Sequence, residues 1–404
     1  MSKVKRISFT NIHGNELSGR MDLPLAMQPK AYAIFAHCFT CNKNFKAVKQ
    51  ISQALIKQGF AVLSFDFTGL GLSEGEFGDT NFSSNVSDII AAAEFLKNSY
   101  AAPKLLVGHS LGGAAVLFAA RQIDSIQAVA TIGSPGEVGH VKHLFAHEIE
   151  KIRAEGMAEV LVGAHKVEIK EQFLIDLDRA DLSHEASSLD RALLILHSPQ
   201  DTVVPVEEAA KLYHAAKHPK SFVSLDGADH ILSRSEDGFY AGEVIASWAK
   251  RYIELDDEIV QPASQVFVRL EYDDLYTTDI RARQHQFIAD EPKEAGGADH
   301  GPTPYELLQS ALGGCVAMTL HMYARRKKWP LEEVQVRLNY NRRHAKDCED
   351  CPDRTGFVHN FEIILDLEGD LTPQQKDRLM EIAHKCPVHR TMIQQKQIAF
   401  KLST

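Results

Sequence analysis

The chain has 404 residues, 44% of them apolar and 24% charged, and a formal net charge of −10 at pH 7. This length exceeds what one hydrophobic core usually serves, so two domains are expected, and the acidic balance argues against nucleic-acid binding. No apolar run is long enough to span a membrane, and residues 1–20 lack the apolar core of a signal peptide, so we expect a cytoplasmic protein with no membrane partner.

The first part of the chain alternates predicted strands and helices after an opening hairpin. The predicted strands are 4–9, 16–22, 31–36, 61–65, 105–107, 126–132, 192–197 and 221–225, and helices are expected at about 45–58, 85–98 and 239–252. This alternation is typical of an α/β fold with a doubly wound, mostly parallel sheet, which binds ligands at the carboxyl ends of its strands. We interpret Asp66 and the glycines after it as turn residues with a structural role.

The strand at 105–107 turns through Gly108-His109-Ser110-Leu111-Gly112 into a helix of small residues. A serine between a strand and a helix in the pattern G-x-S-x-G is typical of a nucleophile elbow, and side chains at either glycine would collide with the neighbouring strand and helix. The helix directs its free N–H groups at this bend, so the amide of Leu111 is the expected oxyanion donor.

Residues 137–189 interrupt the strand–helix alternation and are expected to form a lid over the active-site mouth. Within this lid, helices are expected at 140–154 and 170–177 and a hairpin at 160–169. Three histidines recur there at helical spacing, which we interpret as a solvated helix face and not as a metal site. They are His140, His143 and His147.

An acid and a base follow the last two predicted strands of the sheet. Asp201 comes shortly after 192–197 and His230 shortly after 221–225, at the same sheet edge as Ser110 and in the chain order serine, acid, histidine. His230 would take the serine proton, and Asp201 would orient its ring. Asp229 is an alternative acid, but Asp201 is preferred because Asp229 would have to fold back on its neighbour.

In these features, residues 1–253 resemble the α/β-hydrolase fold family, with Ser110, Asp201 and His230 on its triad positions. The resemblance implies nucleophilic cleavage of a small-molecule acyl substrate, an ester, thioester or amide, or acyl transfer, and it calls for no cofactor.

In that family the loop after the strand at 31–36 supplies the second oxyanion donor, which here would be the amide of Phe39. Cys38 occupies the position of the usual glycine. Cys38 and Cys41 form a C-x-x-C pattern, interpreted either as a redox pair or as two small apolar fillers.

Residues 254–262 form an acidic, polar stretch that we interpret as a linker to a second domain at 263–404. In this domain strands are expected at 265–272, 275–283, 334–342, 359–366 and 397–402, and helices at 303–326 and 372–384. Thr303 and Glu306 fit a capping box at the start of the long helix.

Six cysteines are too few for a disulfide scaffold in a chain of this length, so they are better interpreted as core, redox or metal-binding residues. Cys315 lies in Gly-Gly-Cys and Cys386 in Cys-Pro-Val, and with these settings the α+β second domain resembles the OsmC and organic hydroperoxide reductase family. The resemblance implies that Cys315 attacks an organic hydroperoxide, that Cys386 resolves the sulfenic acid, that a thiol reductant restores both, and that the protein is a homodimer.

Cys315 lies about three turns into its helix, beyond the field of the helix N-terminus, so its thiolate needs a nearby cation. Arg281 and Arg283 are the candidates, and the sequence does not choose between them. Where the peroxidase branch of the family has a glutamate to hold this arginine, the chain has Tyr305, so an inactive pair of buried cysteines stays open as an alternative.

His344, Cys348 and Cys351 form a cluster that could supply three zinc ligands but no evident fourth, and a redox pair or a mobile loop fits it equally well. The sequence thus predicts a lidded serine esterase joined to an OsmC-like thiol domain. The alternative is a thiol-dependent peroxidase whose hydrolase-fold domain is a non-catalytic ligand-binding scaffold.

Overall fold

The computed structural model describes residues 2–24, 29–38, 42–162, 165–255, 264–270, 275–344, 357–395 and 397–402. Its contacts divide the chain into two compact units, one of Met1–Phe267 and Arg281–Gln286, the other of Val268–Ile280 and Phe287–Thr404. The linker at 254–262 and the domain limits on either side of it stay predictions. Across the described residues, no helix combines the length and apolarity that crossing a bilayer requires.

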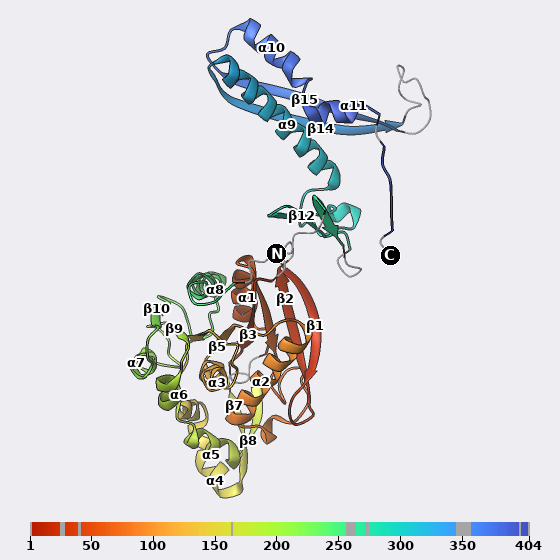
Figure 1. The fold of residues 1–404 in the computed structure, drawn as a ribbon. Coiled ribbons are helices and arrows are strands. Elements are labelled where there is room, and N and C mark those ends of the chain that lie inside the picture. The colour runs from red at the N-terminus through yellow and green to blue at the C-terminus, as the bar shows by residue number, and fades with distance from the viewer. Residues whose placement is uncertain are drawn as a thin grey trace. The chain divides into compact units, whose positions relative to one another are not determined.

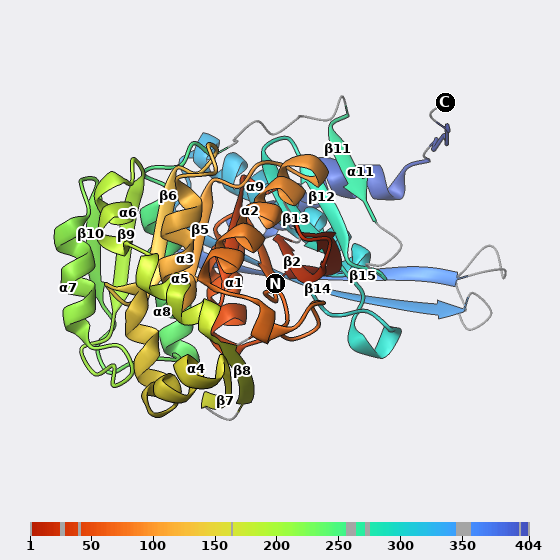
Figure 2. The same cartoon turned by 90° about the horizontal axis from the view of Figure 1, so that it is seen from below.

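The N-terminal unit is built on an eight-stranded sheet in the order β1-β2-β4-β3-β5-β6-β9-β10. The first three strands in this order pair antiparallel and all later neighbours pair parallel. The strands are β1 (Ser2–Thr10), β2 (Glu16–Pro24), β3 (Ala31–Ala36), β4 (Phe60–Phe65), β5 (Leu105–His109), β6 (Ala128–Ile132), β9 (Ala192–His197) and β10 (Lys220–Ser224). Figure 2 shows β9 and β10 at one edge of the sheet, beside α7 (Val206–Ala215).

Helices cover both faces of this sheet (Figure 1). One face packs under α1 (Lys46–Lys57) and α8 (Ser235–Ala249), and the other under α2 (Phe82–Ser99) and α3 (Leu111–Ala120). Because both faces are covered, the central strands β4, β5, β6 and β9 are buried at every position, as expected for a parallel sheet. The predicted doubly wound α/β fold is confirmed.

The insertion after β6 contains the predicted hairpin as β7 (Met157–Val162) and β8 (His165–Lys170). The expected helix at 140–154 is divided into a 3₁₀ segment, η2, and the helix α4, and within η2 the backbone of the buried Phe145 leaves helical geometry. The helical segments are η2 (Val138–Glu148), α4 (Ile149–Glu155), α5 (Glu171–Arg179) and α6 (Leu182–Ser188). Phe173 and Leu177 on α5 join the core beneath α2, so the insertion packs on the sheet domain.

The rest of the chain forms two smaller sheets. A three-stranded sheet contains β11 (Val266–Arg269), β12 (Thr278–Ala282) and β13 (His285–Ala289), and a long two-stranded ladder pairs β14 (Leu331–His344) with β15 (Phe357–Gly369). The long helix α9 (Pro304–Lys327) packs along this ladder with α10 (Pro373–Ala383) and α11 (Pro387–Ile393) (Figure 1).

The predicted last strand at 397–402 is wrong, because these residues have no regular secondary structure. Their alternating apolar side chains are almost fully exposed, with Ile398 at 77%, Phe400 at 95% and Leu402 at 98%. Alternation predicts a strand only where a neighbouring strand edge is there to pair with it.

Candidate active site

Ser110 lies at the sharp turn between β5 and α3, with φ 56° and ψ −124°. A Cβ at Gly108 would run into the carbonyl oxygen of Gly112, and one at Gly112 into that of His37. The two glycines therefore allow the close approach of backbones that holds the serine in this strained conformation. The predicted elbow geometry is present.

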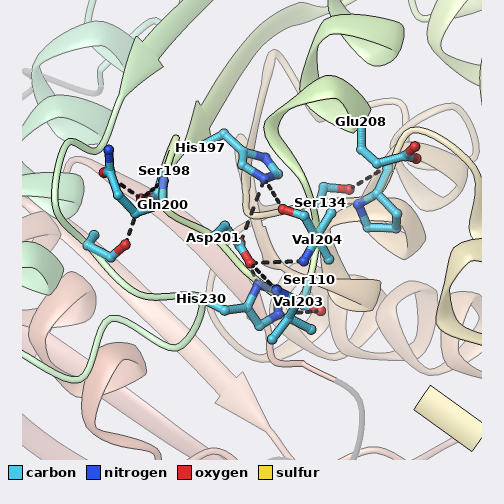
Figure 3. Close-up of polar contacts among 12 residues, drawn as sticks. Ser110, Ser134, His197, Ser198, Gln200, Asp201, Val203, Val204, Glu208 and His230 are labelled. Atoms are coloured by element: carbon cyan, nitrogen blue, oxygen red, sulfur yellow. Dashed lines mark hydrogen bonds and ion pairs between the residues drawn. The ribbon is translucent and has the colours of Figure 1, made fainter. Parts of the chain in front are cut away.

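The side chains of Ser110, His230 and Asp201 lie in one hydrogen-bonded line (Figure 3). His230 Nε2 is 3.0 Å from Ser110 Oγ, and His230 Nδ1 is 2.7 Å from Asp201 Oδ2. The three come from loops after β5, β9 and β10, whose carboxyl ends share one edge of the sheet. The structure thus brings the three sequence-predicted residues together.

Asp201 is held as a carboxylate by its neighbours. Its Oδ1 accepts hydrogen bonds from the amides of Val203 and Val204, both at 2.8 Å. Burial alone would raise the pKa of Asp201, but the His230 ring and these amides outweigh burial and hold it below its ordinary value. Asp229 instead accepts from the amide of Ser233 at 2.8 Å and from its hydroxyl, so the contact with the His230 ring belongs to Asp201.

Of the two predicted oxyanion donors, Leu111 is the first residue of α3, where the amide has no carbonyl partner one turn earlier in the helix. Phe39 lies outside the described residues. Cys38 is disulfide-bonded, while Cys41 lies outside the described residues, so both interpretations of the C-x-x-C pattern stay open.

A buried ion pair joins the loops after β3 and β4. Lys43 Nζ contacts Asp66 Oδ2, and the Lys43 amide donates to Asp66 Oδ1 at 2.7 Å. Asp66 also accepts from the amide of Leu72 at 3.0 Å, which agrees with the structural role expected for it. The sequence analysis missed Lys43, because only the fold shows that this lysine is 5% exposed.

In the C-terminal unit, Cys315 on α9 and Cys386 before α11 are free thiols that pack in one hydrophobic cluster. Burial raises the pKa of Cys386, and Cys315 acts in the same direction. A cavity of about 510 Å³ lies between α9, β15, α10 and α11, and its walls include Val316 and His384, which are close in sequence to Cys315 and Cys386. The two sequence-predicted cysteines are therefore neighbours.

The arginine partner expected for Cys315 is not established by the structure. Arg281 on β12 and Arg283 in the turn after it group with the first compact unit and Cys315 with the second, so a pairing of either with Cys315 stays a prediction. Tyr305 stacks on Tyr340, with ring centroids 4.6 Å apart. Glu306 closes the predicted capping box by accepting from the Thr303 amide at 2.7 Å.

His344 ends β14, while Cys348 and Cys351 lie outside the described residues, so the metal interpretation of this cluster stays open. Within the described ranges, no three histidine, cysteine, aspartate or glutamate side chains come together as a metal site. In the insertion after β6, His140 Nε2 lies 3.1 Å from the Val203 carbonyl oxygen, and its ring packs against that of His143.

A doubly wound sheet with a serine at the turn from strand to helix is the architecture of α/β-hydrolases. Residues 28–176 match the family model described as serine aminopeptidase, S33, and residues 296–403 match the one described as OsmC-like protein.

The chain is also similar to solved structures and to a curated protein. The esterase domain of a Rhodothermus marinus protein is 47% identical, with a TM-score of 0.52 over 62% of this chain and 99% of that structure. Est1E from Butyrivibrio proteoclasticus, with ferulic acid bound, is 21% identical and shows the same fold, with a TM-score of 0.51 over 61% of this chain and 98% of that one. The uncharacterized protein YfhR of Escherichia coli strain K12 is 24% identical over 237 residues, 58% of this chain and 75% of that protein. The chain therefore belongs to the α/β-hydrolase family and carries an OsmC-like domain after the hydrolase fold.

Proposed function

We propose that the N-terminal unit is a serine hydrolase that cleaves a carboxylic ester or thioester through Ser110, His230 and Asp201. The observation that carries the proposal is the line of two hydrogen bonds, at 3.0 and 2.7 Å, that joins the three side chains. The similarity to an esterase domain supports an ester substrate.

In this mechanism, His230 Nε2 accepts the proton of Ser110 as its Oγ bonds to the acyl carbon. The amide of Leu111 donates to the oxyanion, with the amide of Phe39 as the proposed second donor. His230 then protonates the leaving alcohol or thiol as the acyl bond breaks. Water, deprotonated by His230, releases the acid and restores Ser110. Asp201 stays ionised throughout and stabilises the imidazolium.

The test is a Ser110→Ala variant with p-nitrophenyl esters and a matched acyl thioester. We expect kcat/KM to fall by a factor on the order of 10⁴ or more, and a fluorophosphonate to add one mass label to the parent but none to the variant. Ser187→Ala is the control, because this serine on α6 donates to the nearby His184 carbonyl, and the variant should keep both its ester cleavage and its labelling. Equal labelling of the parent and Ser110→Ala would contradict the assignment of Ser110, and a parent that takes up no label and cleaves no ester would favour a ligand-binding scaffold.

We propose as a second activity that the C-terminal unit reduces organic hydroperoxides, because its two free thiols pack in one hydrophobic cluster and the helices that carry this cluster also line a cavity. The Cys315 thiolate attacks the terminal peroxide oxygen, so that an S–O bond forms as the O–O bond breaks. The alkoxide that leaves takes a proton from water and becomes an alcohol, and Cys315 is left as a sulfenic acid. Cys386 then displaces water from the sulfenic acid to form a disulfide, which a thiol reductant returns to two thiols. The raised pKa of Cys386 supports Cys315 as the attacking member.

One equivalent of cumene hydroperoxide should remove two hydrogens from the intact mass of the parent by forming the disulfide. Cys386→Ser should instead accumulate a sulfenic acid that dimedone traps, and Cys315→Ser should consume no peroxide. Unchanged peroxide consumption by Cys315→Ser would contradict this activity. If Ser110→Ala keeps all ester cleavage while Cys315→Ser loses all peroxide reduction, the alternative of a thiol enzyme on a non-catalytic scaffold holds.

We also propose a homodimer formed through the C-terminal unit. Met318 and Met322, one turn apart on one face of α9, are 69% and 70% exposed. Burying such a face against a second copy would remove apolar surface from water. Sedimentation equilibrium should give a mass twice that of one chain, and Met318→Lys should lower the measured mass toward that of a single chain. A parent that stays monomeric would contradict the proposal. The expected cytoplasmic location stays a prediction for cell fractionation.

A further inference from the structure

Two buried histidines outside the proposed triad contact it from different sides. His109 is the last residue of β5 and His197 the last residue of β9, and they are 3% and 0% exposed. A buried imidazole has two polar nitrogens that need hydrogen-bond partners, whereas an apolar side chain has none. Burying a histidine therefore costs desolvation free energy unless its hydrogen bonds offset that cost. Both rings bond to main-chain carbonyls of the site and not to its reacting atoms.

His109 contacts the residue that supplies the proposed base. Its Nε2 lies 2.7 Å from the main-chain carbonyl oxygen of His230, and the two rings are 5.1 Å apart between centroids. Because a carbonyl only accepts, Nε2 carries the proton and donates. The bond holds the backbone from which the His230 side chain extends to Ser110 and Asp201. Burial, assisted by His230, lowers the pKa of His109 to about 3, so the ring donates as a neutral group.

His197 contacts the loop that supplies the proposed acid (Figure 3). Its Nε2 donates to the carbonyl of Val204 at 2.8 Å, and the amide of Val204 donates to Asp201 Oδ1 at 2.8 Å. The same Nε2 is 3.7 Å from Asp201 Oδ2, the oxygen that faces His230. His197 Nδ1 is buried and has no hydrogen-bond partner within the described part of the chain. The ring therefore makes its Nε2 hydrogen bond although burying Nδ1 without a partner costs free energy.

We propose that His109 and His197 are positioning residues for hydrolysis, His109 through the carbonyl of His230 and His197 through the loop of Asp201. The inference rests on the proposed function and extends it to residues that do not touch the substrate. Both contacts come from neutral rings, whereas a lysine or arginine donor would place a positive charge beside His230. A neutral donor aligns the base without opposing the imidazolium that forms when His230 accepts the serine proton.

The test distinguishes the effect of the hydrogen-bond donor from the effect of the ring's bulk. His109→Phe and His197→Phe keep a ring but lose the donor, and His109→Gln and His197→Gln present an amide nitrogen near the position of Nε2. With p-nitrophenyl acetate, we expect kcat to fall about tenfold in each phenylalanine variant, with KM changed less than about twofold, and to recover in the glutamine variants. Circular dichroism melts set a temperature at which every variant is folded.

A second readout needs no turnover. The Nδ1 proton of His230 bonded to Asp201 should give a downfield proton NMR signal in the parent and in both glutamine variants, and should shift or vanish by exchange in the phenylalanine variants. Phenylalanine variants that keep this signal and their kcat would overturn the proposal, as would folded glutamine variants that recover neither. If the parent shows no turnover that depends on Ser110, the proposed function fails, and the NMR signal alone decides whether these residues position His230.

Discussion

The two units differ in how completely they bury their apolar side chains. In the N-terminal unit, helices cover both faces of the sheet, and the central strands are buried at every position. In the C-terminal unit, α9 covers the β14–β15 ladder yet leaves Met318 and Met322 largely exposed. The proposed hydrolase site therefore lies on a core that is covered on both faces, whereas the cysteine pair lies in a core whose helix also leaves apolar surface exposed.

The largest expected effect breaks the hydrolase site without disturbing its core. Asp201→Asn should lower kcat on esters by a factor on the order of 10⁴, because an amide can no longer hold the His230 ring in the tautomer that accepts the serine proton. Circular dichroism should show an unchanged fold, since asparagine has the shape of aspartate.

Asp229→Asn is the matched control, because this carboxylate bonds to Ser233 and not to the His230 ring. It should change kcat by less than about threefold. A larger loss in Asp229→Asn than in Asp201→Asn, measured on the same ester, would reverse the choice of acid.

The stability of the two units should respond differently to acid. Burial lowers the pKa of His37, His109 and His197, whereas in the unfolded chain each takes up a proton near pH ~6.5. Below that pH the unfolded state binds more protons, so the stability of the N-terminal unit is full above pH ~6.5 and is lost as pH falls toward the folded pKa values. Each histidine contributes a slope of about 1.4 kcal/mol per pH unit in that window.

The chain has two tryptophans, Trp248 on α8 and Trp329 after α9, so each unit has its own fluorescent reporter. Urea titrations of Trp329→Phe follow the N-terminal unit, and those of Trp248→Phe follow the C-terminal unit. The first should lose stability between pH 7 and 5 and the second should lose less. Equal losses in both variants would mean that the buried histidines are not the cause.

A smaller effect tests the backbone of the elbow. Gly112→Ala should lower the free energy of unfolding of the N-terminal unit by about 1–3 kcal/mol, because the new methyl group meets the backbone carbonyl of His37. Gly139→Ala in the lid, where a Cβ meets nothing within 4 Å, should stay within about 0.5 kcal/mol of the parent. Similar urea midpoints for both variants would show that the close approach at Gly112 is not required.

The sequence predicts the fold and the meeting of Ser110, Asp201 and His230 because both depend on local signals. The elbow is a contiguous motif, and the other two residues follow strands whose ends must share an edge of a parallel sheet. The bonds of His109 and His197 could not be predicted, because each reaches a carbonyl brought close only by folding. The available signals were the position of His109 inside the elbow motif and that of His197 four residues before Asp201.

Short helices and the pairing of strands could not be predicted from the sequence for related reasons. The helix α11, Pro387–Ile393, has seven residues, too few for a helical period to stand out, and its one signal is the proline at its start. The segment 397–402 alternates as a strand does, but pairing is a property of its neighbours and not of its own side chains.

The order of elements along the chain also bears on synthesis at the ribosome. All eight strands of the large sheet and the helices that cover its faces lie within residues 2–249. The long helix that carries Cys315 begins only at Pro304. Because N-terminal domains fold first as a chain emerges, Ser110, Asp201 and His230 can be assembled before the residues that hold the thiols have been translated.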